Sequence, residues 1–183
     1  MIEKLLIEHC SPTLASLKSA NLCAVHYSSE QELEEQISYW NRQLKRKGIT
    51  ILLMKKKPGW ALIYVCRKEQ LQKRLQDPEA AEFLTEYGYI EMRVDAALER
   101  LKSRLNQEDG FPHEIGIFLD YPVGDVRGFI LNAGHNYKCK GCWKVYCNEC
   151  DAVKLFAKYE KCRTVYRRLW ETGITVQKLT VAA

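Results

Sequence analysis

The clearest pattern in the chain is a pair of apolar runs on either side of a short polar turn. Residues 49–54 and 60–66 are rich in β-branched and aromatic residues, and Lys55-Lys56-Lys57-Pro58-Gly59 separates them. Pro-Gly suits the two central positions of a type II turn, so the pattern predicts a β-hairpin. Because both runs are almost continuously apolar, we expect this hairpin in the middle of a sheet that helices cover on both faces.

Apolar residues at three- and four-residue spacing predict several amphipathic helices. The most regular one begins after Ser29, a suitable N-cap, and ends before Gly48. Near the N-terminus, Pro12 disfavours a helical conformation at the residue before it, so we expect His9 and Cys10 at the end of an element. Further helices are predicted over 67–76, 78–88, 92–106, 124–132 and 148–173.

Three other segments have the composition of strands, namely 21–27, 136–146 and 174–181. Together with the 49–66 hairpin they predict an α+β fold with a mainly antiparallel sheet. This sheet contains the hairpin, the 136–146 strand and the C-terminal strand, and four to six helices cover it. We find neither a linker nor a repeat, so residues 1–183 are expected to form a single domain.

Composition narrows the function classes. Of the 183 residues, 46% are hydrophobic and 28% charged, which is typical of a globular protein. No run approaches the roughly 20 apolar residues of a membrane-spanning helix, and no signal peptide is apparent, so we expect a cytoplasmic protein without a membrane partner. The 28 basic residues nearly match the 23 acidic ones, and this balance disfavours a nucleic-acid partner. Eight cysteines in the cytoplasm predict reduced thiols.

Four separated motifs give the chain a resemblance to a known family. They are His9-Cys10-Ser11-Pro12-Thr13-Leu14-Ala15, Phe111-Pro112-His113-Glu114-Ile115-Gly116, the segment 121–130 with Tyr121-Pro122, Asp125-Val126 and Gly128-Phe129-Ile130, and Gly141 with Trp143-Lys144-Val145-Tyr146. In this order they resemble the bacterial family catalogued as domain of unknown function 3793. The resemblance implies no established activity, and it suggests a context of iron uptake and flavodoxins in anaerobic bacteria. The chain departs from the family pattern at Cys142 and Asp120, where the family has tyrosine and glycine.

Two Cys-x-x-Cys pairs, at 139–142 and 147–150, allow a metal or a redox hypothesis. If 143–146 is a strand, Cys142 and Cys147 lie roughly 17 Å apart, which is too far for one tetrahedral site. A redox role for the second pair is disfavoured by Glu149, because a neighbouring negative charge disfavours thiolate.

The leading hypothesis for a site combines His9-Cys10 with His113-Glu114, two polar pairs next to prolines. Imidazole, thiolate and carboxylate are ligands for iron or zinc, so Cys10, His113 and Glu114 are the candidate metal ligands. Tyr121 and Trp143 extend the predicted ligand-binding set. We therefore expect an accessory protein that binds a metal, haem or a small redox ligand, with an electron carrier or a small molecule as its partner. The structural alternative is that Cys10 is a core residue and His113 and Glu114 hydrogen-bond a buried loop.

Two other classes stay open at this point. A thiol-dependent enzyme would use Cys10 as nucleophile and His9 or His113 as base. An interaction module would use Lys55-Lys56-Lys57 and Trp60 to contact a protein or nucleic acid. The sequence decides neither whether the protein is an enzyme nor its oligomeric state.

Overall fold

The fold is α+β, as predicted, and it consists of two compact units. The structure is a computed structural model that describes residues 1–107 and 110–182. Unit 1 contains Met1–Leu71 and the C-terminal residues from Lys161, and unit 2 contains Gln72–Glu160. Within the described residues, no helix combines the length and the apolar composition needed to cross a membrane.

Unit 1 is built on a three-stranded antiparallel sheet of β1 (Ala20–His26), β2 (Ile49–Lys57) and β3 (Trp60–Arg67) in the order β1-β3-β2. The predicted hairpin is therefore confirmed, and Gly59 adopts the positive φ of +71° that the second central residue of a type II turn requires. Only β3 occupies the middle of the sheet, however. It is buried along almost its whole length, whereas β2 is an edge strand with partly exposed residues.

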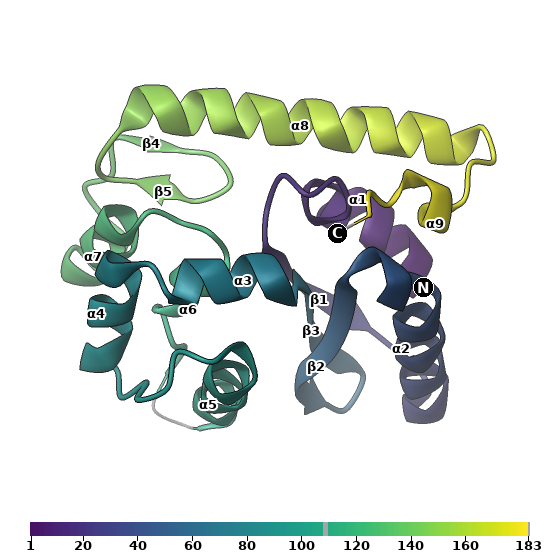
Figure 1. The fold of residues 1–183 in the computed structure, drawn as a ribbon, viewed down its shortest axis with the longest axis horizontal. Helices are drawn as coiled ribbons and strands as arrows, with labels where there is room; N and C mark the ends of the chain where they lie inside the picture. Colours follow the sequence, from purple (N-terminus) through teal and green to yellow (C-terminus); the bar gives the residue numbers. More distant parts are fainter. Residues whose placement is uncertain (108–109, 183) are drawn as a thin grey trace. The chain divides into compact units, whose positions relative to one another are not determined.

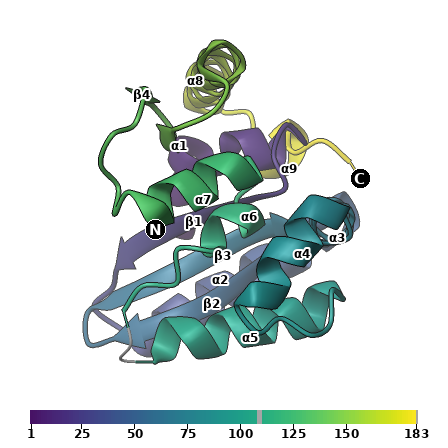
Figure 2. The ribbon, with the colours of Figure 1, turned by 90° about the vertical axis from the view of Figure 1, so that its left-hand side faces the viewer.

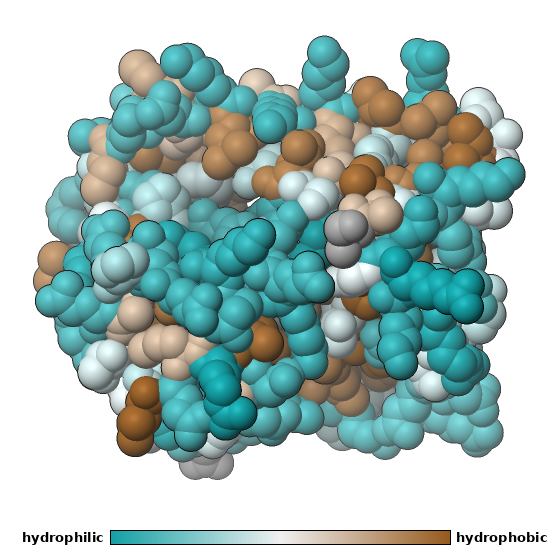
Figure 3. Space-filling view, viewed as in Figure 1, coloured by the Kyte–Doolittle hydropathy of each residue, from teal (hydrophilic) through white to brown (hydrophobic). Residues whose placement is uncertain are grey.

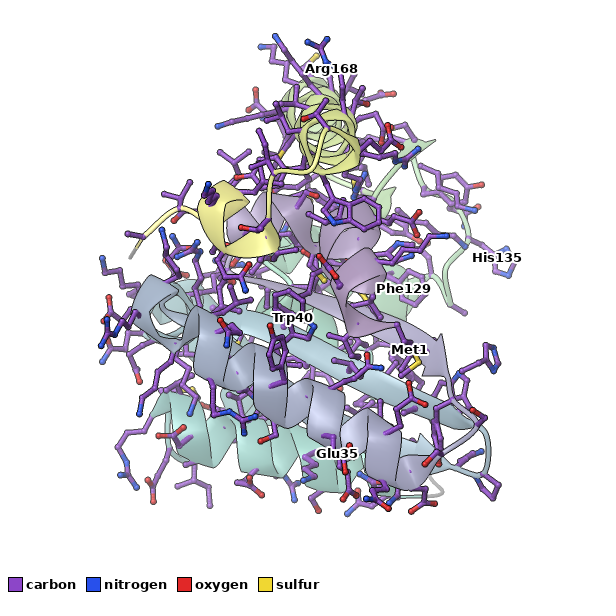
Figure 4. All side chains as sticks on the ribbon, turned by 90° about the vertical axis from the view of Figure 1, so that its right-hand side faces the viewer. Met1, Glu35, Trp40, Phe129, His135 and Arg168 are labelled. Atoms are coloured by element: carbon purple, nitrogen blue, oxygen red, sulfur yellow. The ribbon has the colours of Figure 1, made fainter. Side chains whose placement is uncertain are left out.

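Helices α1 (Ile2–Leu14) and α2 (Glu30–Leu44) pack against this sheet, and α2 lies beside β2 in Figure 1. Ser29 caps α2 as expected, accepting a hydrogen bond from the backbone N–H of Glu32 at 3.3 Å. Trp40 of α2 is buried between α2 and α1, whereas Glu35 lies on the outer side of α2 (Figure 4). The exposed surface of α2 is accordingly hydrophilic in Figure 3. The 3₁₀ helix η1 (Lys45–Lys47) and α9 (Val176–Leu179) complete unit 1.

Unit 2 is mainly helical. Its elements are the end of α3 (Lys68–Leu75), α4 (Pro78–Glu86), α5 (Val94–Asn106), α6 (Ile115–Phe118), α7 (Val123–Leu131), β4 (Cys139–Lys140), β5 (Lys144–Val145) and the start of α8 (Glu149–Glu171). Helices α6 and α7 pack side by side (Figure 2). Strands β4 and β5 pair only with each other and form a separate two-stranded hairpin.

Three predictions about the sheet and its helices were wrong. The segment 136–146 is not one strand, because the chain reverses at Gly141, whose N–H donates to Trp143 at 3.0 Å, and the run divides into the β4–β5 hairpin. The segment 174–181 contains α9 rather than a strand, since Thr175 caps a turn that buries Val176 and Leu179 on one side. The described residues contain nine α-helices instead of four to six, several of them only about one turn long.

The N-terminal element also differs from the prediction. Helix α1 continues through Pro12, so His9 and Cys10 lie inside the helix rather than at its end. Pro12 is in the last turn, where its missing N–H costs one hydrogen bond. Burial of the residues around Pro12, from Cys10 to Leu14, offsets that cost.

Candidate functional site

A buried aspartate organises the motif-rich part of unit 2. Asp125 of α7 accepts hydrogen bonds from the indole N–H of Trp143 at 2.7 Å, the backbone N–H of Tyr146 at 2.8 Å and the backbone N–H of Cys147 at 2.9 Å. Asp125 itself is 3% exposed. Three donors to one buried carboxylate fix β5 and the turn after it to α7.

Tyr121 and Trp143, both predicted ligand-binding residues, are brought together by this network. Their rings are stacked with centroids 4.7 Å apart, and the Trp143 ring also meets Phe156 edge to face at 4.6 Å. Trp143 is buried, and the Tyr121 hydroxyl donates to the backbone carbonyl of Cys142 at 3.3 Å. Through these contacts, Tyr121 and Trp143 have a packing role inside unit 2.

Helix α7 approaches β5 closely because Gly128 has no side chain. A Cβ at Gly128 would lie 2.4 Å from Cγ and 2.6 Å from Cβ of Tyr146. A Cβ at Gly124 would also meet a neighbour at 2.4 Å, but that atom is the terminal Sγ of Cys147, whose Cβ is 3.7 Å away. An added methyl group at Gly128 would therefore clash with Cβ and Cγ of Tyr146, and this Cβ cannot move without the backbone. At Gly124 it would clash only with the Cys147 sulfur, which rotation about the Cα–Cβ bond can move away.

The contrast predicts effects of different size for two similar substitutions in α7. Glycine to alanine in a helix ordinarily stabilises by up to about 1 kcal/mol. We expect Gly128→Ala instead to lower the free energy of unfolding by about 2–4 kcal/mol, because overpacking forces the backbones apart. Gly124→Ala is the matched control and should change it by less than about 1 kcal/mol. Urea unfolding followed by circular dichroism measures both, and equal effects would contradict the close packing of Gly128.

Glu114 occupies a buried position with its charge paired. It is 1% exposed and forms an ion pair with Arg104, whose side chain is 27% exposed. The Tyr89 hydroxyl donates to the same carboxylate oxygen at 3.3 Å. Burial, followed by the nearby charge of Glu114, raises the pKa of Tyr89 well above its usual value. Arg104 and Tyr89 thus hold one carboxylate oxygen of Glu114 within unit 2.

His113 has a different environment from its neighbour in sequence. Its side chain is exposed, and its ring contacts Phe111 at a centroid distance of 5.9 Å and Phe129 at 4.9 Å. The ammonium group of Lys144 lies 5.6 Å from the Phe129 ring centre and 5.1 Å from that of Tyr137. We call Phe111, His113, Phe129, Tyr137 and Lys144 the aromatic cluster.

The aromatic cluster exposes three of its members to solvent, Phe111, His113 and Tyr137, and contains one charged group, Lys144. Phe111 is 51% and Tyr137 41% exposed, both high for large apolar rings. Lys144 Nζ donates to the Gly134 carbonyl at 2.7 Å, which holds the ammonium group beside the rings. The segment that follows Gly134 is exposed, and Figure 4 shows His135 projecting away from the ribbon. Rings with a cation can stack on a flat molecule and pair with its negative charge.

A polar group next to the aromatic cluster has no partner among the described residues. The hydroxyl of Tyr146 is buried and makes no hydrogen bond. Burial raises the pKa of Tyr146, and the charges of Tyr137 and Asp125 raise it further. A buried hydroxyl without a partner is a group that a bound molecule can satisfy.

The other predicted pair, His9 and Cys10, lies in unit 1. His9 is exposed on α1, whereas Cys10 is fully buried in the apolar core. Burial raises the pKa of the Cys10 thiol, and an activated nucleophile has a lowered pKa and an accessible sulfur. A site made jointly by this pair and His113-Glu114 stays a prediction.

The Cys-x-x-Cys pairs lie on the β4–β5 hairpin and at the start of α8. Burial, followed by the charge of Glu149, raises the pKa of Cys139, and burial, followed by Asp125, raises that of Cys147. Both shifts oppose the thiolate form that binds metals. In the part of the chain that the structure describes, no three or more His, Cys, Asp and Glu side chains are grouped as metal ligands.

These observations define an α+β protein with a carboxylate-anchored hairpin and an exposed aromatic cluster. The chain belongs to the family described as Protein of unknown function (DUF3793), which matches residues 6–180, and the resemblance inferred from the sequence motifs is confirmed. The match spans both units. No curated protein and no solved structure matches the chain.

Sequence reasoning missed Asp125 as an organising residue and Phe111, Phe129, Tyr137 and Lys144 as one surface. A signal for Asp125 was available, because a lone acid inside the apolar stripe of residues 123–131 must find donors when that stripe is buried. The aromatic cluster gives no such signal, since its members are up to 33 residues apart, from Phe111 to Lys144, and do not follow one period.

Proposed function

We propose that this protein binds a planar, negatively charged aromatic molecule at the aromatic cluster of unit 2. The class includes flavin mononucleotide and haem, which combine a flat conjugated ring with phosphate or carboxylate groups. The single observation that carries the proposal is the set of rings made by exposed Phe111 and His113 and half-buried Phe129, with the Lys144 ammonium beside Phe129. A ligand of this class accords with the small redox ligand or haem expected from the sequence.

Two physical features support this ligand class. Exposed rings contribute stacking energy of about 1–3 kcal/mol per stacked base in comparable sites. A lysine held by the Gly134 carbonyl is pre-positioned for an anionic group, which lowers the entropy lost on binding. We also place the protein in the cytoplasm, because the eight cysteines are all free and free thiols persist in reducing compartments.

The test measures binding of five probes by isothermal titration calorimetry: flavin mononucleotide, riboflavin, haem, inorganic phosphate and a single-stranded oligonucleotide. We expect flavin mononucleotide to bind more tightly than riboflavin, and phosphate alone to bind too weakly to measure. Phe111→Ala should weaken flavin mononucleotide and riboflavin alike by about tenfold, since it removes a stacking ring. Lys144→Met should weaken only the phosphate-bearing flavin, by about fivefold.

Lys102→Met is the matched control, because it removes the same charge from an exposed position of α5. It should leave all affinities unchanged. Absence of binding by every planar probe, or equal affinities in the parent and in both cluster variants, would refute the proposal. Preference for a single-stranded oligonucleotide over flavin mononucleotide would overturn it in favour of nucleic-acid binding.

A further inference from the structure

Two cysteines from different elements meet in the core of unit 1. Cys10 on α1 and Cys23 on β1 are 13 residues apart, and their Sγ atoms are separated by 3.7 Å, within hydrogen-bonding distance. Both thiols are free and buried, with exposures of 0% and 8%. Helix α1 packs directly on β1, so the two sulfurs are held facing each other by regular structure.

The two sulfurs are inequivalent. The hydrogen bond with Cys10 lowers the pKa of Cys23, and the positive charges of Lys18 and Arg163 lower it further against the effect of burial. Burial raises the pKa of Cys10. Cys23 is also the more exposed residue of the two. Since thiolate and access both favour reaction, Cys23 is the better nucleophile of the pair and Cys10 is placed to react second.

We propose that Cys10 and Cys23 form a reversible disulfide when the protein meets hydrogen peroxide. Bonding requires the sulfurs to approach from 3.7 Å to about 2.05 Å, a shift that side-chain rotation and a small movement of α1 can supply. This modification site lies in unit 1 and does not depend on the aromatic cluster of unit 2.

The reaction has two balanced steps. The Cys23 thiolate attacks one peroxide oxygen, an S–O bond forms, the O–O bond breaks, and the released hydroxide takes up the thiol proton as water. The Cys10 sulfur then attacks the Cys23 sulfenic acid, the S–S bond forms, the S–O bond breaks, and a second water leaves with the Cys10 proton. The two thiols lose two electrons and two protons, and peroxide is reduced to two waters.

The product joins α1 to β1 covalently. A cross-link constrains the unfolded chain, so the oxidised protein should be more stable than the reduced protein. Because the core of unit 1 already holds the two sulfurs together, oxidation should leave the secondary structure unchanged. The disulfide would therefore form on exposure to oxidant while the protein stays folded.

The tryptic cleavage sites in the sequence allow the Cys10–Cys23 disulfide to be detected directly. Trypsin cleaves after Lys4, Lys18 and Arg42, so it places Cys10 in peptide 5–18 and Cys23 in peptide 19–42. The full-length protein is reduced, freed of reductant, treated with hydrogen peroxide, blocked with N-ethylmaleimide in urea, digested and analysed by mass spectrometry. We expect a linked 5–18/19–42 peptide lighter by two hydrogens than the two separate peptides, and its loss after dithiothreitol. The melting temperature should rise by a few degrees on oxidation.

Two variants distinguish a specific Cys10–Cys23 disulfide from unspecific oxidation. Cys10→Ala should abolish both the linked peptide and the rise in melting temperature, and should leave a Cys23 sulfenic acid that dimedone traps. Cys162→Ala removes another buried thiol of unit 1 and should retain both effects. Failure to detect the linked peptide in folded parent protein, or an equal yield from protein oxidised in urea, would overturn the proposal. Circular dichroism confirms that each variant is folded before oxidation.

Discussion

Replacing Arg67 with methionine is expected to lower the free energy of unfolding by about 3–5 kcal/mol. Its buried guanidinium donates to four carbonyl oxygens, those of Thr13 at 2.7 Å, Leu14 at 2.8 Å, Lys47 at 3.0 Å and Val181 at 2.8 Å. Two of these carbonyls end α1, where the helix dipole favours a cation. Methionine fills the space but leaves the four acceptors without this donor.

Arg67 links three parts of unit 1 that are far apart in sequence. It joins the end of α1, the 3₁₀ helix η1 and the C-terminal segment to the last residue of β3. Burial lowers the pKa of the Arg67 guanidinium, and hydrogen bonds to carbonyl dipoles compensate for the lost hydration. Loss of the side chain should therefore loosen the ends of the chain as well as the sheet.

Two comparisons make this prediction specific. Arg67→Lys keeps the charge but replaces the planar fork by a single ammonium group, so it should still cost about 2–3 kcal/mol. Arg93→Met removes an arginine whose side chain is 80% exposed, and it should leave the unfolding curve unchanged. Urea titrations monitored by circular dichroism give the three values. If Arg67→Lys matched the parent protein, the four-carbonyl arrangement would not contribute to stability as argued.

Asp125→Ala is the second substitution with a large expected effect, about 3–5 kcal/mol of unfolding free energy. It leaves the Trp143 indole N–H and the backbone N–H groups of Tyr146 and Cys147 without their acceptor inside unit 2. Asp125→Asn preserves the shape but exchanges one acceptor oxygen for a donor, so at least one of the three bonds is lost. We expect a smaller cost of about 1–3 kcal/mol for it.

A double-mutant cycle with Trp143→Phe isolates one of these bonds. The single substitution removes the indole N–H and keeps a ring that can stack on Tyr121. Because both changes break the same hydrogen bond, the double variant should be more stable than the sum of the single effects implies, by about 1–2 kcal/mol. Additive effects would show that Asp125 does not stabilise the protein through Trp143. The fluorescence of the four tryptophans taken together should also shift to longer wavelength in Asp125→Ala, because Trp143 loses its buried partner.

Local sequence patterns were sufficient to predict secondary structure wherever a segment's own residues decide its conformation. The β2–β3 hairpin follows from two apolar runs and Pro58-Gly59, and α2 follows from its apolar stripe and the Ser29 cap. Helix α4 likewise follows from its own residues, since the Asp77 side chain accepts from the N–H of Ala80 at 3.1 Å and caps the helix before Pro78. In each case the residues that decide the turn or the helix cap lie a few positions apart in the sequence.

Local patterns misled wherever long-range packing outweighs propensity. The segment 174–181 has β-branched residues, yet it forms α9 because Val176 and Leu179 enter the core of unit 1 at helical spacing. Pro12 predicted that the first element ends near His9 and Cys10. Helix α1 nevertheless continues, because the buried residues around Pro12 pack against the sheet. Propensities of a few tenths of a kcal/mol cannot compete with the burial of whole side chains.

By itself, the sequence determined the α+β class, the family, the hairpin of unit 1 and the positions of most helices, because these depend on periodicity, turns and ordered motifs. Only the tertiary structure decided which side chains meet. Asp125 reaches Trp143 18 residues later, Arg67 reaches Val181 114 residues later, and Cys10 faces Cys23 13 residues later. Such contacts depend on how elements pack, and packing is a property of the whole folded chain that no local pattern encodes.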